Sequence, residues 1–515
     1  MLNPPTNLST GEPIGWWERP WFMLALVLLA TVPLLYPPIP PLVDLFGHMG
    51  RYRVQLDIDS SPWLHRYYGF HWAAIGNLGV DLLVMPLGRL LGLETAVKLI
   101  VLCIPPMTVA GFLWVAYEVH HRVPPTALFA LPFAYSHPFM FGFVNFALSV
   151  ALAFLAFGLW LNLGARKKLR LRAVLFVPIS IVVFFAHTFG WGMLGLLCFS
   201  AEAVRQHDEG RGWFRSGVNA ALHASVMAIP IFITIAWRRE AHGGMTRGWF
   251  DWDFKWKYLQ MVLRDRWHWF DIASLCAVGL VLLTALISRR LTFSRNLLFT
   301  AFVLLVCFFI LPRTVFGSTY ADMRLLPYVL ATAVLAIRSR GETYPPLART
   351  LAIAGLAFCV IRLGANTASL AIAANEQKAE LVALDHIPMG ARVAWITDEG
   401  ECGRVWALPR NSHLGAMVIV RREGFSNDQW VMEGLNLLDL KYHQAGKFRA
   451  DPSQITRPSY CRGRGGWFVE RALPQLPRDA FDYLWLLNAP PVDPHLVEGL
   501  TPVWRNDRSI LYRLH

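Results

Sequence analysis

The segment that decides the fold runs from Pro37 to Asp59 and reads PPIPPLVDLFGHMGRYRVQLDID. It directly follows an apolar run, residues 21–36, whose length is near that of a membrane span. The Pro-rich exit ends this run, and Asp44, His48 and Arg51 follow within eight residues. The segment therefore predicts a chain that leaves a membrane and at once places an acid, an imidazole and a guanidinium at its surface.

The composition is that of a polytopic helical membrane protein. Of the 515 residues, 55% are hydrophobic and only 16% are charged, and the mean hydropathy is +0.39. The first apolar run lacks a small-residue cleavage site, so we expect it to be retained as the first span. The net charge of +13 lies in short loops between apolar runs, a pattern that membrane orientation produces. We therefore expect a lipid bilayer, and no nucleic acid, as a partner.

The apolar runs predict a bundle of eleven membrane-spanning helices. They cover residues 21–36, 97–117, 125–141, 143–163, 171–186, 190–206, 217–237, 271–288, 296–311, 324–338 and 350–373. A further run from Asn77, NLGVDLLVMPLGRLLG, is short and contains Asp81 and a proline. We interpret it as a surface or re-entrant helix, because this choice places the Lys/Arg-rich loops at 118–122, 165–172, 205–215, 288–295 and 338–349 on the inner side. The N-terminus is then inside and the C-terminus outside, although Arg238 and Arg239 fall on the outer side.

Residues 375–515 have a different composition, with no run long enough to span a membrane. Short β-like stretches occur at 392–397 (RVAWIT), 416–420 (AMVIV), 483–488 (YLWLLN) and 509–515 (SILYRLH). A helix through NEQKAELVALDHI, from Asn375, joins them to the last span. We therefore predict an all-α membrane bundle over residues 1–374, with a large first outer loop at 37–96, and a soluble α/β domain over 375–515.

The cysteines support an outer position for this domain. Five of the seven lie inside apolar runs, where a thiol behaves as a small hydrophobe. Only Cys402 and Cys461 lie in the aqueous domain. In an oxidising periplasm such a pair is a disulfide candidate, and the alternative is two unrelated free thiols.

This topology gathers most of the unusual polar residues on the outer face. Four segments contribute them: Asp44, His48, Arg51 and Asp81 from the first loop; His137 and Asn145 from one turn; His187 from another; and Arg313, Tyr320, Asp322 and Arg324 from residues 311–327. Ionisable groups at membrane depth are costly and usually mark a functional pathway or an ion pair. We expect a shared outward-facing cavity. The structural alternatives are an interfacial His187, a snorkelling Arg324, and an Asp322–Arg324 pair.

The order of these parts resembles the C-type (GT-C), polyprenyl-phosphate-sugar-dependent glycosyltransferases. The pieces that match are VDLFGHMGR (43–51) after the first span, NLGVDLLVMPLGRLLGLETAVKL (77–99), and the outer domain from Asn375. The resemblance in layout covers most of residues 20–373. The second acid that some members carry in a later outer loop has no clear counterpart here, and Asp81 and Asp322 are the candidates.

The resemblance implies transfer of a sugar from a polyprenyl-phosphate donor to an envelope glycan, lipid or protein, with inversion, at the outer face of a bacterial inner membrane. In this reading Asp44 is the general base, His48 orients it or binds the acceptor, and Arg313 or Arg324 binds the leaving phosphate. The other substrate-binding candidates are Arg51, Asp81, His137, Asn145, His187, Tyr320 and Asp322. No cofactor is identified, and the need for a divalent metal is open.

Two other classes of function remain open at this point. One is a transporter or flippase for a lipid-linked solute, although no internal repeat is visible and the polar residues favour one face over the bilayer midplane. The other is a non-catalytic assembly factor whose outer domain binds an envelope glycan. No ATP-binding loop, zinc signature or Ser-His-Asp elbow occurs in the sequence.

Overall fold

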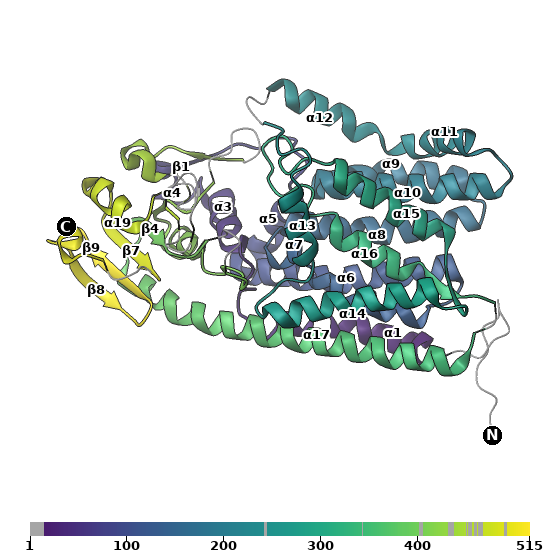
Figure 1. Cartoon of the computed structure of the whole chain (residues 1–515). Helices are drawn as coiled ribbons and strands as arrows, with labels where there is room; N and C mark the ends of the chain where they lie inside the picture. Colours follow the sequence, from purple (N-terminus) through teal and green to yellow (C-terminus); the bar gives the residue numbers. More distant parts are fainter. Residues whose placement is uncertain are drawn as a thin grey trace.

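The computed structural model describes residues 15–515 apart from 241–244, 342, 401–404, 431–436, 450, 452–455, 458–460, 462–466 and 489–491, and apart from the side chains of 237–240. The chain forms a helical bundle with a smaller domain of strands and short helices at one end (Figure 1). The 36-residue helix α17 (Pro345–Glu380) runs along the whole bundle and leads into that domain. The last predicted span and the predicted linker helix are thus one continuous helix.

The bundle contains helical structure at every predicted span. Its helices are α1 (Pro20–Leu29), α2 (Val32–Leu35), α6 (Leu93–His120), α8 (Val144–Ala165), α9 (Leu169–Ala186), α10 (Thr188–Asp208), α11 (Trp213–Ala224), α12 (Ile229–Glu240), α14 (His268–Ile287), α15 (Arg295–Ile310), α16 (Leu326–Leu335) and α17. Among the described residues, five helices are long and apolar enough to cross a membrane: α6, α8, α9, α14, and α17 with its short continuation η4 (Leu381–His386). A sixth is possible if the bent pair α11–α12 forms one span. The number eleven therefore stays a prediction.

The third predicted span is not an α-helix along its length. Residues 125–141 form the 3₁₀ helix η2 (Pro125–Tyr135) and the short α7 (His137–Met140). Pro132 and Pro138 lie within this range, and each removes a backbone N–H that a continuous α-helix would use. Because this segment is buried against α6, α16 and α17, it forms part of the core of the bundle.

The loops rich in Lys and Arg lie together at the end of the bundle opposite the C-terminal domain (Figure 1). Strand β2 (Leu291–Phe293) pairs with β3 (Ile337–Ser339), which joins two of these loops. The guanidinium of Arg122 donates to Thr343, and Arg295 forms an ion pair with Asp208. The grouping predicted from charge is therefore present, whereas the side of the membrane on which it lies stays a prediction.

The short run from Asn77 forms α5 (Gly79–Leu91), a 13-residue helix. At 1.5 Å per residue it is about 20 Å long, short of the roughly 30 Å hydrocarbon core. It packs against α3 (Leu45–Asp57), α6 and α8. The expectation of a short helix that does not span the membrane agrees with this length.

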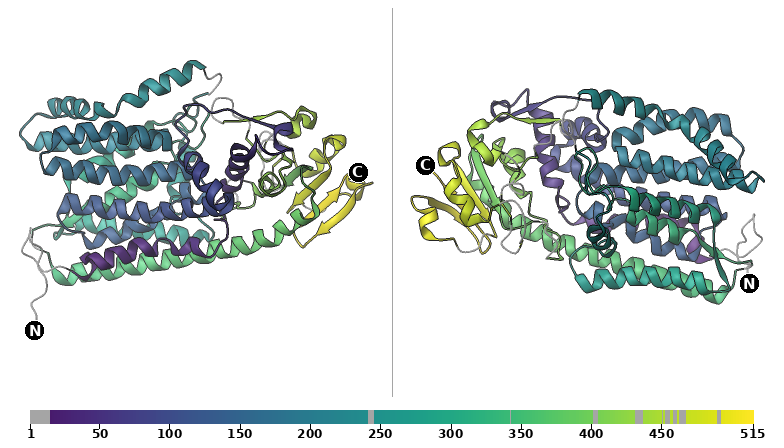
Figure 2. Two further views of the ribbon diagram at one scale, coloured as in Figure 1. Left: turned by 180° about the vertical axis from the view of Figure 1, so that it is seen from behind. Right: turned by 45° about the horizontal axis from the view of Figure 1, so that its top comes forward.

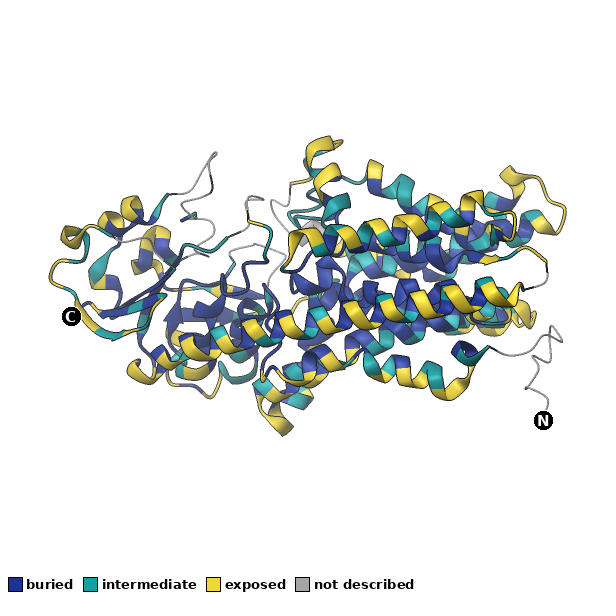
Figure 3. Ribbon diagram, turned by 60° about the horizontal axis from the view of Figure 1, so that its bottom comes forward, coloured by how far each residue is buried: buried dark blue, intermediate teal, exposed yellow. Residues whose placement is uncertain are grey.

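The outer surface of the bundle is apolar, as a lipid-facing surface requires. Exposed side chains on α14 and α17 include Leu283, Leu286, Ile353, Val360 and Ile361. Figure 3 shows exposed positions along the outward side of α17 and buried positions on its inward side. Large exposed apolar side chains gathered on one surface of a folded chain mark a membrane or protein contact. The distribution supports a bundle that is embedded in a bilayer.

The C-terminal domain is built on a five-stranded sheet with the order β5-β4-β7-β9-β8. Its strands are β4 (Arg392–Thr397), β5 (Phe425–Ser426), β7 (Tyr483–Leu487), β8 (Thr501–Arg505) and β9 (Ser509–Arg513). Strand β4 runs parallel to β5 and β7, and β9 runs antiparallel to β7 and β8. Three of the four predicted strands are therefore present, and Trp395 and Trp485 pack together at their centre.

The fourth predicted strand, AMVIV at 416–420, is wrong, because these residues form the end of η5 (Leu414–Ala416) and the start of α18 (Met417–Arg422). A short, fully apolar run is compatible with a buried strand or a buried helix, and periodicity cannot distinguish them. Helix α18 packs against α3 of the first outer loop. Strand β1 (Tyr68–Phe70) of the same loop pairs with β6 (Leu438–Leu440). The C-terminal domain is thus docked on the first outer loop, as Figure 2 also shows.

Candidate active site

Asp44 occupies the N-cap position of α3, immediately outside the helix. Its backbone N–H donates to the carbonyl of Phe141 at 2.9 Å. Gly142 follows with φ +97°, and a Cβ there would lie only 2.6 Å from the nitrogen of Asp44. Only glycine suits both the backbone conformation and the close approach. The turn around Phe141 therefore fixes the position of Asp44, whose side chain is 15% exposed.

The C-terminal domain places a histidine opposite this carboxylate. Nε2 of His413 lies 3.8 Å from Oδ1 of Asp44, and its Nδ1 lies 2.7 Å from Oδ1 of Asp428. The other oxygen of Asp428 accepts the backbone N–H of Ala416 at 2.9 Å. Asp451 is adjacent, and with His413 and Asp428 it forms a group whose donor atoms could bind a metal ion. No local motif marks these three residues, so they cannot be singled out from the sequence alone.

Burial and charge shift the titration of both facing groups. Burial raises the pKa of Asp44 to about 7, against the opposing positive charges of His413 and Arg324. Burial also disfavours the charged form of His413, but the carboxylates of Asp428, Asp451 and Asp44 outweigh it and raise the pKa of His413 to about 10. The carboxylates of Asp428 and Asp451, both in the C-terminal domain, thus raise the pKa of the imidazole that faces Asp44.

Arg324 places a buried positive charge on the other side of the site. Its guanidinium lies over the ring of Phe143, with 4.4 Å from Cζ to the ring centre, and 3.5 Å from Nε2 of His187. It donates to the hydroxyl of Ser318 at 3.3 Å. Within the described part of the chain no carboxylate forms an ion pair with it, and its Nε is buried without a partner. A buried guanidinium without a carboxylate is suited to bind an anion.

Arg313 and Tyr320 lie around the same turn. The guanidinium of Arg313 stacks on the ring of Phe254, with 3.5 Å from Cζ to the ring centre, and lies 5.4 Å from that of Tyr320. The ring of Tyr320 packs on those of Phe141 and Phe143. The structure therefore brings Asp44, His187, Arg313, Tyr320 and Arg324 around one turn, and their shared role stays a prediction.

A second set of candidates forms a separate buried network. Arg51 and Asp81 form an ion pair at 2.8 Å. Nδ2 of Asn145 donates to Asp81 at 3.0 Å, while its Oδ1 accepts the backbone N–H of Val80 at 2.6 Å. Gln55 donates to the backbone carbonyl of Asp81. These contacts join α3, α5 and α8, so the carboxylate of Asp81 is already neutralised and hydrogen-bonded inside the protein.

Asp322 is paired as well, with Lys255 at 2.9 Å rather than with Arg324. Nζ of Lys255 also donates to the carbonyls of Phe308 and Leu311, at 2.7 and 3.0 Å. Both side chains of the pair are at most 2% exposed. The pair joins α13 (Trp252–Gln260) to the end of α15, which gives Asp322 a structural role.

Among the described residues, neither of the two remaining histidine candidates forms an ion pair with Asp44. In the described structure no side-chain hydrogen bond joins His48 to Asp44, because Asp44 lies before the first turn of α3 and faces the C-terminal domain. The ring of His48 lies against Trp430, and burial together with the positive charge of Arg51 lowers the pKa of His48 well below its usual value. His137 packs edge-on against Phe141, and its buried Nδ1 has no hydrogen-bond partner in the part of the chain that the structure describes.

Cys461 forms a disulfide in the structure. The five cysteines of the apolar runs are free. Cys402 lies outside the described residues, so the predicted Cys402–Cys461 pair stays a prediction.

This architecture is similar to that of solved structures of known proteins. No protein-family model and no curated protein matches the sequence. The structure is similar to the crystal structure of ArnT from Cupriavidus metallidurans in the apo state, with a TM-score of 0.50 and 11% identity over 96% of this chain and 97% of that chain. It is similar also to ArnT from the same organism bound to undecaprenyl phosphate, with a TM-score of 0.51 and 11% identity over 97% and 99% of the two chains. At this identity the likeness concerns the fold, which extends over the bundle and the C-terminal domain together. The chain thus has the fold of ArnT, as its resemblance to the C-type glycosyltransferases predicts.

Proposed function

We propose that this chain is a membrane glycosyltransferase that moves a sugar from a polyprenyl-phosphate donor to an envelope acceptor at the outer face of a bacterial inner membrane. The observation that carries the proposal is that Asp44 and the buried Arg324, which has no carboxylate partner among the described residues, lie around one turn at the end of the bundle that carries the C-terminal domain. The fold shared with an ArnT bound to undecaprenyl phosphate supports a polyprenyl lipid as the donor carrier. The C-terminal domain is then periplasmic.

The proposed reaction is a single displacement. The acceptor hydroxyl attacks the anomeric carbon as its proton passes to the carboxylate of Asp44, which acts as general base. The bond from the anomeric carbon to the phosphate oxygen breaks, and its electron pair leaves with the polyprenyl phosphate. Because attack and departure occur on opposite faces of the sugar, the anomeric configuration inverts.

Arg324 binds the departing phosphate in this mechanism. Its charge faces no carboxylate at ion-pair distance in the described structure, so an incoming phosphate gains a charge-assisted contact without displacing a carboxylate. The aromatic rings of Phe143 and Phe189 cover the guanidinium and keep it from bulk water. Arg313 is the second cation in reach of the same turn.

The docked C-terminal domain has a role in this mechanism. His413 and Trp430 lie over the segment that carries Asp44 and His48. Covering a reacting carboxylate excludes water that would otherwise compete with the acceptor and strengthens charge interactions in the site.

Mass spectrometry of envelope glycolipids tests the proposal in cells. A deletion strain should lose one sugar-modified species and accumulate its unmodified acceptor, and the wild-type gene should restore it. Complementation with Asp44→Asn should leave the loss unchanged at wild-type protein levels. A deletion strain with an unaltered set of glycolipids, glycans and glycoproteins would argue against any transferase.

A further inference from the structure

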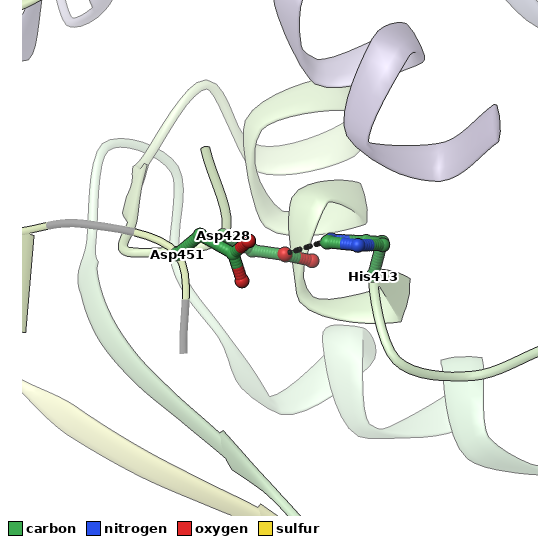
Figure 4. Close-up of side chains that lie close together, drawn as sticks. All are labelled: His413, Asp428 and Asp451. Atoms are coloured by element: carbon green, nitrogen blue, oxygen red, sulfur yellow. Dashed lines mark hydrogen bonds and ion pairs between the residues drawn. The ribbon is translucent and has the colours of Figure 1, made fainter. Parts of the chain in front are cut away.

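His413, Asp428 and Asp451 come from three separate segments of the C-terminal domain, and their side chains converge (Figure 4). One donor atom of each lies within 4.8 Å of those of the other two. The three residues are 6%, 0% and 2% exposed. Donors bonded to one tetrahedral ion at about 2.1 Å lie about 3.4 Å from one another. Separations of up to 4.8 Å would therefore have to shorten by at most about 1.4 Å to place all three donors on a shared ion.

We propose that His413, Asp428 and Asp451 bind a divalent transition-metal ion, Zn²⁺ or Mn²⁺, beside Asp44. One imidazole nitrogen with two carboxylates is a donor set for these ions, whereas Mg²⁺ and Ca²⁺ prefer oxygen ligands alone. Nδ1 is the imidazole donor, because it is the nitrogen that faces Asp428. The two carboxylates balance the charge of the ion.

Contacts behind the ligands fix their positions. The backbone N–H of Ala416 binds the second oxygen of Asp428 at 2.9 Å. The backbone N–H of Asp451 donates to the carbonyl of Gln429 at 3.0 Å, and Gln429 donates to the carbonyl of Gly47 at 3.0 Å. Hydrogen bonds of this kind orient metal ligands and are commonly needed for tight binding.

The other nitrogen of His413 gives an independent observation. A histidine that binds a metal usually donates its remaining N–H to a carboxylate, a backbone carbonyl or a water molecule. Nε2 of His413 faces Oδ1 of Asp44 at 3.8 Å, so a small approach completes this arrangement. The ion would polarise the imidazole, strengthen the N–H as a donor and orient the carboxylate of Asp44. Metal binding follows from the C-terminal domain alone, whereas this effect on Asp44 rests on the proposed function.

The competing explanation is a metal-free ion pair in which a protonated His413 lies between its carboxylates. The full-length protein, purified in detergent without chelator, distinguishes the two. After incubation with Zn²⁺ or Mn²⁺ and removal of unbound ions, elemental analysis should find one ion per chain, and EDTA should lower the melting temperature reversibly. Asp451→Asn and His413→Gln should lose the ion.

His71→Gln is the matched control. His71 and Asp439 form an exposed histidine–carboxylate pair at 2.7 Å, so this variant loses a similar pair away from the cluster and should keep the ion. Wild-type protein that retains no ion would overturn the proposal. An Asp451→Asn variant that retains as much ion as the wild type would also overturn it and indicate an adventitious ion only. If the variants fail to fold, the metal content of the wild type and its response to EDTA decide. None of these readouts uses transferase activity, so a failed metal site and a failed transferase remain distinguishable.

Discussion

Oδ1 of Asp44, in the first outer loop, faces Nε2 of His413, in the C-terminal domain, at 3.8 Å. Around this contact the loop and the domain share the β1–β6 pairing and the packing of α18 on α3. The candidate site is therefore completed by a domain that is remote in the sequence. This relationship predicts that transfer depends on how closely the domain is docked.

Gly50 tests the docking directly. A Cβ at this position would lie 2.5 Å from Nε2 of Gln429 and 3.1 Å from Ile419, so the side chain of Gly50→Val must displace both and should loosen the docking of the domain on α3. A shift of about 1 Å can cost about 10²-fold in rate. Radiolabelled sugar transfer by purified protein measures the loss, with Gly195→Val as the control because nothing lies within 4 Å of Gly195. Equal activity in the two variants would show that transfer does not depend on how closely the C-terminal domain is docked.

Arg324→Gln should weaken donor binding more than it slows the chemical step. A charge-assisted hydrogen bond contributes about 1.5–3 kcal/mol, which corresponds to a ten- to hundredfold rise in the KM for the polyprenyl-phosphate sugar. The KM of Arg324→Lys should lie between those of the wild type and Arg324→Gln, because a lysine keeps the positive charge but lacks the planar guanidinium fork. Donor titration at saturating acceptor measures both constants. An unchanged KM with reduced kcat would place Arg324 elsewhere in the mechanism.

Asp81→Asn should destabilise the protein and impair transfer only through folding. It leaves Arg51 buried without its ion-pair partner, and breaking a buried pair costs about 3–5 kcal/mol. The melting temperature in detergent should fall clearly. The reverse result, a wild-type melting temperature with transfer abolished, would identify Asp81 as the second catalytic acid that some C-type glycosyltransferases carry.

Cys461→Ser should lower the stability of the C-terminal domain by about 2–5 kcal/mol, as loss of a disulfide does in small domains. The predicted partner is Cys402, so thiol labelling of denatured, non-reduced wild-type protein should leave both unmodified. Labelling of Cys402 in that protein would show that Cys461 pairs in another way.

Much of this structure follows from local sequence. The apolar runs predict the bundle, and the β-like stretches at 392–397 and 483–488 predict β4 and β7, which pair inside the sheet. The AMVIV run is misassigned because its burial against α3, rather than its own pattern, determines its helical state.

The candidate site is predictable in part. Asp44 and Arg324 can be selected from the sequence because charged side chains beside membrane spans are costly to bury. The partners of Asp81 and Asp322 cannot, because Arg51, Asn145 and Lys255 come from other helices that only the packing brings close. The group around His413 is invisible for the same reason, since its members come from separate segments and have no common spacing.

The most direct measurement of the central claim compares Asp44→Asn with Asp57→Asn in purified protein. Each substitution removes one carboxylate, that of Asp44 at the start of α3 or that of Asp57 at its end. The side chain of Asp57 is partly exposed and forms an ion pair with Arg53. Loss of a general base costs about 10²–10⁴-fold in rate, so Asp44→Asn should lose transfer by that factor and keep a wild-type melting temperature. Asp57→Asn should transfer at the wild-type rate. Wild-type transfer by Asp44→Asn would contradict the account.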